Sequence, residues 1–293
     1  MKLKNEILQI YNLDDNNKIE ENMTIVTDIE QTLVDINKLK KVFSNAKKLV
    51  IEIISYNKDN QYFKLEIDPF GYINSKRRKK DGVTYFGFIL DGRDNNNEVD
   101  FAINNNDNVS SEGEFNGRHF MIKFNPDDLN YYIKDLGKGF GTFIKILGWT
   151  EIKNNFLLNI GENYLIFSIG DDNDEENEFD DKNNEPLNIK IVSVNIQQKN
   201  IKILPSDCPI KIGRSEENNI FIDDDLLSRV HCTIDFNNNK WYIIDGNAKN
   251  GLKEDKEIKN STNGSWIYAF EETPITDKLI FKANHNLFIC NLV

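Results

Sequence analysis

The chain has few residues that could bind a metal, form disulfides or cross a membrane. Its 293 residues include three cysteines and three histidines. Because Cys208, Cys232 and Cys290 are odd in number and lack metal-ligand spacing, we expect reduced thiols in an intracellular protein, cytoplasmic or nuclear. No stretch approaches the ~18 apolar residues that a membrane span needs. The sequence therefore predicts no metal site, no cofactor and no membrane partner.

Positive charge is also scarce. The 48 acidic residues outnumber 36 basic ones and give a net charge of -12. This charge opposes a broad electrostatic grip on nucleic acid, which we do not expect as a partner. The dense basic cluster at residues 76–80 precedes the turn pair Asp81–Gly82 and indicates a solvated hairpin tip. A nuclear-import signal and an acidic docking surface are the alternatives for this cluster.

Signatures of catalysis are missing as well. The sequence has no Gly-rich loop that leads into a helix with a following Lys, and no kinase catalytic-loop signature. A nucleophilic role for Ser228 beside His231 would need a third residue to orient the histidine, and also an oxyanion hole. We therefore predict that the protein is not an enzyme and has no catalytic residues.

Hydrophobic periodicity separates a helical segment from a β-rich remainder. Between Thr27 and Lys48, apolar residues recur at intervals of three and four, and Thr27 with Glu30 forms a possible capping box. This predicted helix either packs on the domain that follows or binds a partner. From Leu49 onward, short β-rich runs alternate with Gly, Asn, Asp and Pro, which favours antiparallel sandwiches.

Charge marks the boundary between two β domains. Eight Asp or Glu residues lie between positions 171 and 181, too many to bury. A calcium loop fits this segment poorly, because Asn177 and Asn183 stand where a Gly and a bidentate Glu are needed. The predicted organisation has four parts: a polar tail with an amphipathic helix at 1–48, a β domain at 49–170, an acidic linker at 171–186 and a β domain at 187–293.

Residues suited to reading a phosphate are concentrated in the last domain. Arg214 follows the flexible Gly213 and offers a planar fork of donors that can hold two phosphate oxygens. Ser228 adds a hydroxyl donor and Arg229 a second cation. His231 is expected to face inward and brace the loop by hydrogen bonding.

A second group of polar residues follows in a later loop. Thr262 and Asn263 precede Gly264, and an amide side chain here can both donate to and accept from a peptide backbone. A strand restarts directly afterwards at Trp266. We therefore expect this loop to face the same ligand as Arg214.

In this order the motifs resemble the forkhead-associated (FHA) domain, whose pattern is Gly-Arg, Ser-Arg-x-His, Asp and Asn-Gly-Thr. The resemblance covers residues 201–293, and its motifs are Gly213–Arg214, Ser228–Arg229–Val230–His231, Asp245 and Asn263–Gly264–Ser265. It implies a sandwich of two antiparallel sheets whose loops at one end bind a phosphothreonine of a partner protein.

The same resemblance assigns roles to the site residues. It implies that peptide and phosphate are bound by Arg214, Ser228, Arg229, Thr262 and Asn263, with structural support from Gly213, His231 and Gly264. In the family's usual spacing the Asn follows the strand Asp by five residues, which points to Asn250 instead. The strand restarting at Trp266 favours Asn263.

Residues 49–170 resemble a second, divergent FHA domain. Gly92–Arg93, Arg118–His119 and Phe140–Gly141–Thr142 repeat parts of the pattern. Phe140, however, stands where the peptide-contacting Asn is expected, and Ser110 is too far from His119. We expect this repeat to be a scaffold or protein-binding domain that does not read phosphate.

The predicted fold is therefore all-β, with two FHA-type antiparallel sandwiches in tandem and a short N-terminal helix. The predicted function is a phosphothreonine-dependent adaptor. The alternative is a structural assembly protein whose sandwiches bind partners independently of phosphate. The sequence does not indicate the partner's identity or the oligomeric state.

Overall fold

The computed structural model describes most of the chain from Phe43 onward. The described ranges are 43–55, 62–75, 81–88, 99–103, 117–170, 185–193, 199–252, 258–284 and 286–293. The basic cluster and the acidic segment 171–184 lie outside them, as does all but the end of the predicted helix. Phe43, from the apolar stripe of that helix, packs edge-on against Phe70, with ring centroids 4.5 Å apart.

The described elements are almost entirely β-strands, which confirms the all-β prediction. The exception is a short 3-10 helix, Pro205–Asp207. Within the described ranges, no helix is long and apolar enough to cross a membrane.

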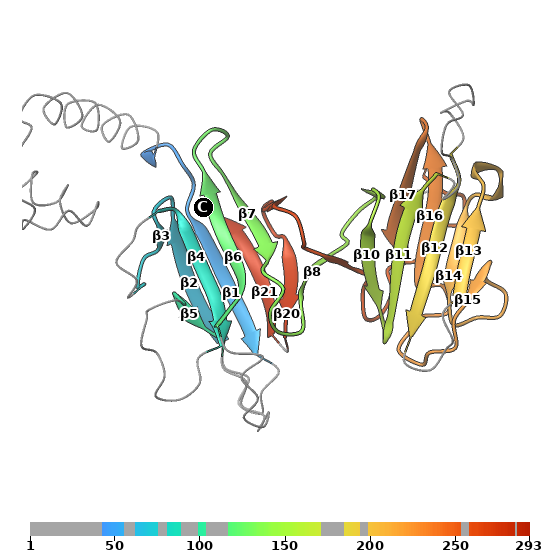
Figure 1. Ribbon diagram of the computed structural model, residues 1–293, viewed down its shortest axis with the longest axis horizontal. Coiled ribbons are helices and arrows are strands. Elements are labelled where there is room, and N and C mark those ends of the chain that lie inside the picture. The colour runs from blue at the N-terminus through green and yellow to red at the C-terminus, as the bar shows by residue number, and fades with distance from the viewer. Residues whose placement is uncertain are drawn as a thin grey trace, which may run out of the picture. The chain divides into compact units, whose positions relative to one another are not determined.

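The chain forms two compact units, each a β-sandwich (Figure 1). Unit 1 consists of Met1–Thr142 together with Ala269–Val293, and unit 2 consists of Phe143–Tyr268. These units differ from the contiguous domains 49–170 and 187–293 that the sequence predicts. The last strands of the first half of the chain belong to unit 2, and the last strands of the second half belong to unit 1.

Unit 1 combines strands from both ends of the chain. One sheet has the order β3-β2-β1-β21-β20, and its strands are β1 (Leu49–Ser55), β2 (Tyr62–Asp68), β3 (Gly71–Tyr72), β20 (Ile280–Ala283) and β21 (Asn286–Leu292). The other sheet has the order β19-β7-β6-β4-β5, and its strands are β4 (Val83–Phe88), β5 (Phe101–Ala102), β6 (Gly117–Asn125), β7 (Asn130–Asp135) and β19 (Thr273–Pro274). Phe120 stacks on Phe86 and contacts Phe288 edge-on, so aromatic rings join the two sheets.

Unit 2 holds the middle of the chain. Its first sheet has the order β13-β12-β11-β10-β18-β8, and its strands are β8 (Thr142–Lys145), β10 (Phe156–Ile160), β11 (Asn163–Ile169), β12 (Leu187–Ser193), β13 (Lys199–Ile203) and β18 (Trp266–Tyr268). Its second sheet has the order β15-β14-β16-β17-β9, and its strands are β9 (Thr150–Glu151), β14 (Ile210–Gly213), β15 (Ile220–Phe221), β16 (Cys232–Asn237) and β17 (Lys240–Asp245). The pairs β14–β15 and β4–β5 are parallel, whereas the other strand pairs described in both units are antiparallel.

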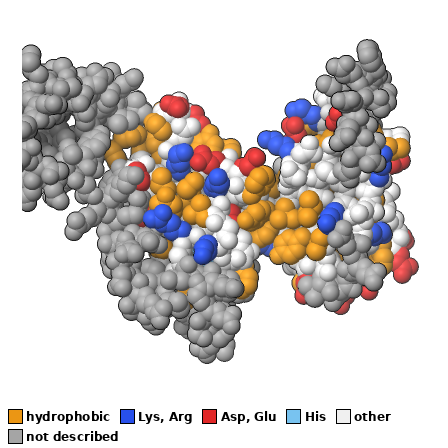
Figure 2. Space-filling model, viewed as in Figure 1, with side chains coloured by type: hydrophobic (Ala, Val, Ile, Leu, Met, Phe, Trp, Pro, Cys, Tyr) orange, Lys and Arg blue, Asp and Glu red, His pale blue; other side chains and the backbone are white. Residues whose placement is uncertain are grey.

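Alternating burial explains how the strands form these layers. In β11 the residues alternate between buried and exposed, so one face enters the core and the other faces outward. The core of unit 2 joins the two sheets through residues such as Leu158, Leu165 and Ile234. On the outer face, Tyr164 and Val192 are paired and exposed, and Figure 2 shows hydrophobic side chains gathered over β10 and β11.

Full-length strand pairing supports the exchange between the halves. β21 pairs with β1 over seven positions, from Leu49↔Leu292 to Ser55↔Asn286. β11 pairs with β12 over seven positions as well, from Asn163↔Ser193 to Ile169↔Leu187. Each exchanged strand therefore satisfies the backbone groups of an edge that would otherwise lack a neighbour.

Candidate functional site

Gly213, at the end of β14, lets two loops of unit 2 approach closely. A Cβ atom at this position would lie 2.5 Å from the carbonyl oxygen of Arg229 and 2.8 Å from that of Ser228. The next residue, Arg214, donates its backbone N–H to the Ser228 carbonyl at 3.1 Å. The side chains of Arg214 and Arg229 are both exposed. The strand end thus brings two cations and the Ser228 loop together.

Asn218 holds the Arg214 loop against the loop that carries Ser228 and Arg229. Its Nδ2 donates to the carbonyl of Arg229 at 2.6 Å and to that of Ser215 at 2.9 Å. The sequence reasoning did not identify this residue, because an Asn in an Asn-rich loop carries no distinguishing signal. It fixes the backbone on which both arginines are carried.

His231 is buried beneath the loops and links two of them. Its Nδ1 accepts the backbone N–H of Ser228 at 3.1 Å, and its Nε2 lies 3.1 Å from the Gly264 carbonyl. A carbonyl can only accept, so Nε2 carries the proton. Burial lowers the pKa of His231 below its ordinary value. The hydrogen bonds of the ring therefore connect the Ser228 loop to the turn at Gly264.

The carboxylate of Asp245, at the end of β17, organises the turn that follows. Its Oδ1 accepts hydrogen bonds from the hydroxyls of Ser261 at 2.6 Å and Ser265 at 2.8 Å. Its Oδ2 accepts the backbone N–H of Ser261 at 3.1 Å. The Ser261 hydroxyl in turn accepts the Gly264 N–H at 2.9 Å. Asp245 is only 4% exposed, so this network lies under the surface.

Thr262 and Asn263 are exposed at the tip of this turn and face the Ser228 loop. The backbone N–H of Thr262 donates to Ser228 Oγ at 2.9 Å. Asn263 Nδ2 donates to the Leu226 carbonyl at 2.7 Å, and the Asn263 carbonyl accepts the Trp266 indole N–H. The structure thus places both residues beside Ser228.

The competing position, Asn250, lies in a different environment. A Cβ on the neighbouring Gly251 would be 2.5 Å from Asp235 Oδ2, and the Leu252 N–H donates to that same oxygen at 2.6 Å. Asp235 belongs to the interior of β16, away from the strand end that leads from Ser228. The residues that follow Asn250 therefore contact the interior of β16, whereas Asn263 lies beside the Ser228 loop.

Unit 1 contains only part of a corresponding arrangement. Buried His119 contacts Asn284, whose Nδ2 lies 3.1 Å from His119 Nδ1. Asn284 also accepts the backbone N–H of Phe140, and the Phe140 side chain is 51% exposed. Gly92–Arg93 and Ser110 lie outside the described residues. An apolar ring therefore occupies the turn that carries an amide in unit 2.

A comparison with protein-family models bears on the unit 2 loops. Residues 210–279 match the FHA domain model. FHA domains are phosphopeptide-recognising modules of protein–protein interaction, and they are not catalytic. The match begins at β14 and contains all of the unit 2 loop residues described above. A search of curated proteins finds no match to the chain.

The match also crosses the boundary between the two units. Its residues 269–279 belong to unit 1. It does not include residues 49–170, so the second, divergent FHA repeat stays a prediction.

Proposed function

We propose that this chain is a phosphothreonine-dependent adaptor that recognises its partner through the FHA loops of unit 2. The observation that carries the proposal is a set of donors, two exposed and one half-buried, held by buried residues. Arg214, Ser228 and Asn263 come from three loops, which buried His231 and Asp245 tie together. Such preorganisation lowers the cost of ordering a binding site.

Each side chain has a distinct part in the proposed complex. Arg214 and Arg229 supply charge-assisted hydrogen bonds to the phosphate oxygens. Arg214 makes no side-chain hydrogen bond or ion pair to any residue that the structure describes, so its guanidinium is available. Ser228 Oγ donates to Thr262 Oγ1 over a long 3.4 Å, a bond that a phosphate oxygen can replace. Asn263 keeps its Oδ1 for a peptide N–H.

The surroundings require that phosphate be recognised at short range. Glu216, Glu217, Asp223 and Asp225 lie in the same loops and are exposed, and the whole chain has a net charge of -12. Long-range attraction of an anion is therefore weak. Specificity for phosphate has to come from the geometry of the donors around Arg214.

The test is calorimetric titration of the full chain with one peptide in three forms: phosphothreonine, phosphoserine and unphosphorylated. We expect measurable binding of the phosphothreonine form, weaker binding of phosphoserine and none of the unphosphorylated peptide. Arg214→Ala should remove the binding, whereas Lys199→Ala, which deletes an exposed cation of β13, should not. Equal affinities for the phosphorylated and unphosphorylated peptides would refute the proposal.

A second candidate function concerns unit 1. The exposed ring of Phe140 favours a phosphate-independent protein contact, because it can neither donate to nor accept from a peptide backbone. On this hypothesis the protein is a structural assembly factor and unit 1 does not read phosphate. Its complexes would then survive phosphatase treatment, and loss of every partner on dephosphorylation would exclude it.

A further inference from the structure

The loop that carries Ser228 is attached to a hairpin outside the FHA match. Asp224 Oδ2 accepts the backbone N–H of Glu162 at 2.9 Å and the side-chain Nδ2 of Asn163 at 2.7 Å. Glu162 lies in the turn between β10 and β11, and Asn163 is the first residue of β11. The turn comes from the first half of the chain, but it folds as part of unit 2 because of the exchange of strands.

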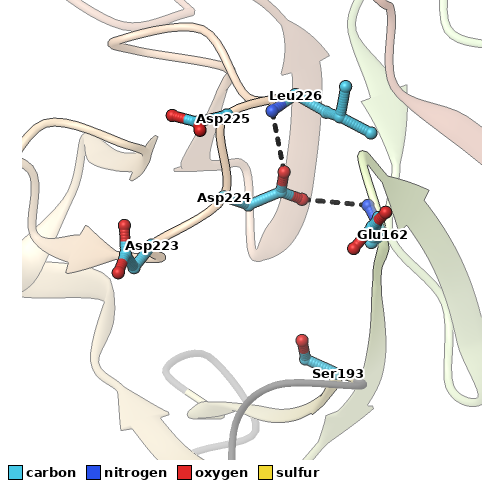
Figure 3. A pocket seen from close by; sticks show the side chains of 6 residues that line it. All are labelled: Glu162, Ser193, Asp223, Asp224, Asp225 and Leu226. Carbon is cyan, nitrogen blue, oxygen red and sulfur yellow. Dashed lines mark hydrogen bonds between the residues drawn. The ribbon is translucent and has the colours of Figure 1, made fainter.

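The other oxygen of the same carboxylate points along the loop. Asp224 Oδ1 accepts the backbone N–H of Leu226 at 2.7 Å (Figure 3). The Leu226 carbonyl accepts the side-chain amide of Asn263, also at 2.7 Å. A continuous series of hydrogen bonds therefore runs from the β10–β11 turn through Asp224 and Leu226 to Asn263.

The turn is shaped to receive this carboxylate. Gly161 has φ of +55°, and a Cβ at this position would lie 2.3 Å from Asp224 Oδ2. Asn163 is 1% exposed, so its amide donates to the carboxylate from a buried position. Hydrogen bonds to an ionised acceptor are stronger than those between neutral groups.

An apolar contact also holds the loop on this side, because Leu227 is buried in the unit 2 core and its Cδ2 lies 3.1 Å from where a Cβ at position 161 would stand. Next to the anchor lies a cavity of about 320 Å³, lined by Glu162, Ser193, Asp223, Asp224, Asp225 and Leu226 (Figure 3). Asp223 and Asp225 project along this cavity without packing into an apolar core. Among the described residues, Asp224 supplies the polar attachment between the loop and the hairpin, beside the apolar contact of Leu227.

We propose that Asp224 is a positioning residue for phosphopeptide binding, held by the Gly161–Asn163 turn and acting on Asn263 through Leu226. This inference rests on the proposed function. It extends the functional unit to the β10–β11 hairpin, which the FHA match at 210–279 omits. A change in the first half of the sequence should then alter ligand binding in the second.

The test uses substitutions in the full chain. Asp224→Ala and Gly161→Ala should each weaken binding of the phosphothreonine peptide about 5- to 30-fold, since each breaks a charge-assisted contact. The matched control is Gly170→Ala, at the end of the same hairpin. Gly170 also has a positive φ, +99°, but a Cβ there would meet nothing within 4 Å. This variant should bind like the parent.

A double-mutant cycle separates positioning from general damage. Once Asp224 is replaced by Ala, a Cβ at position 161 no longer meets its carboxylate. In the double variant the Cβ still approaches Leu227 Cδ2 at 3.1 Å, so the combined loss should be only slightly greater than that of Asp224→Ala and well below the product of the two single losses. Losses that multiply would mean that the two residues act separately and would overturn the inference.

A second readout does not depend on any ligand. The side-chain amide signals of Asn263 in a nitrogen–proton correlation spectrum should shift in Asp224→Ala and Gly161→Ala, but not in Gly170→Ala. Should Asp224→Ala fail to fold, Asp224→Asn keeps one acceptor oxygen and should show a smaller effect. Unchanged affinity and unchanged Asn263 signals in the folded variants would overturn the inference alone. If the parent binds no phosphopeptide, the proposed function and this role fail together, whatever the Asn263 signals do.

Discussion

The exchange of strands predicts that the binding unit is residues 143–268 and that residues 187–293 do not fold alone. A fragment that begins at residue 187 lacks β8 to β11, which complete the sandwich of unit 2. Seven buried core residues of unit 2 lie in the missing segment: Ile146, Ile152, Phe156, Leu158, Ile160, Leu165 and Phe167. Each buried side chain of this size contributes about 1.5–3 kcal/mol, so the loss amounts to roughly 10–20 kcal/mol.

This loss is as large as the whole stability of an ordinary domain, about 5–15 kcal/mol. The assay is to produce both fragments, follow thermal unfolding by circular dichroism, and titrate each with the phosphothreonine peptide. We expect a cooperative transition and binding for 143–268, and neither for 187–293. A folded 187–293 fragment that binds the peptide would show that β20 and β21 can replace β10 and β11 beside β12, and would refute the exchange.

Three further predictions concern the site itself. Arg214→Ala should weaken phosphopeptide binding by about 2–4 kcal/mol, because the phosphate loses charge-assisted bonds; a change no larger than that of Lys199→Ala would contradict it. His231→Ala should abolish phosphopeptide binding and lower the melting temperature by leaving Ser228 N–H and Gly264 O unpaired, whereas His119→Ala in unit 1 should leave binding intact. Binding should weaken as pH falls through the second pKa of the phosphate, near ~6, and a pH-independent affinity would exclude recognition of the dianion.

The buried histidine adds a separate effect of pH on folding. Burial lowers the pKa of His231 in the folded state, so the unfolded chain binds the proton more readily. Its contribution to stability is fully present above the ordinary histidine pKa and is lost as pH falls from there toward the lowered value. The melting temperature of His231→Ala should accordingly depend less on pH in this range than that of the parent.

The sequence was sufficient to predict the strands and the positions of the loops. Short β-rich runs separated by turn residues mark most of the first-half strands correctly, and in the structure Arg214, Ser228 and Asn263 lie on neighbouring loops of unit 2. This works because a half-buried strand and a Gly at a close backbone approach leave local patterns. The strand that restarts at Trp266 already favours Asn263 over Asn250, and the structure adds contacts that the sequence does not show, between Asn263 and the Leu226 carbonyl and between Leu252 and Asp235.

The exchange of strands could not be predicted in this way. β11 and β21 both alternate between buried and less buried residues, and both match the length of the strand they join. The local pattern indicates that each of these strands pairs with the first strand of a β domain. It does not show whether that first strand is β1 or β12. Asn218, Ser261 and Asp224 were missed for a related reason: their partners lie in other loops, and single Asn, Ser and Asp residues are common in loops.

In each unit, the hairpin that comes from the other half of the chain contacts a residue that holds the loops in place. In unit 2 the β10–β11 turn binds Asp224, which holds the Ser228 loop. In unit 1 the β20–β21 turn supplies Asn284, which contacts His119 Nδ1, the ring atom that in His231 accepts a backbone N–H. Each half of the chain thus contributes to the loop cluster of the other. A fragment cut between the two halves of the sequence should therefore lose part of its loop cluster, whereas a fragment cut at the boundaries of unit 2 keeps the whole site.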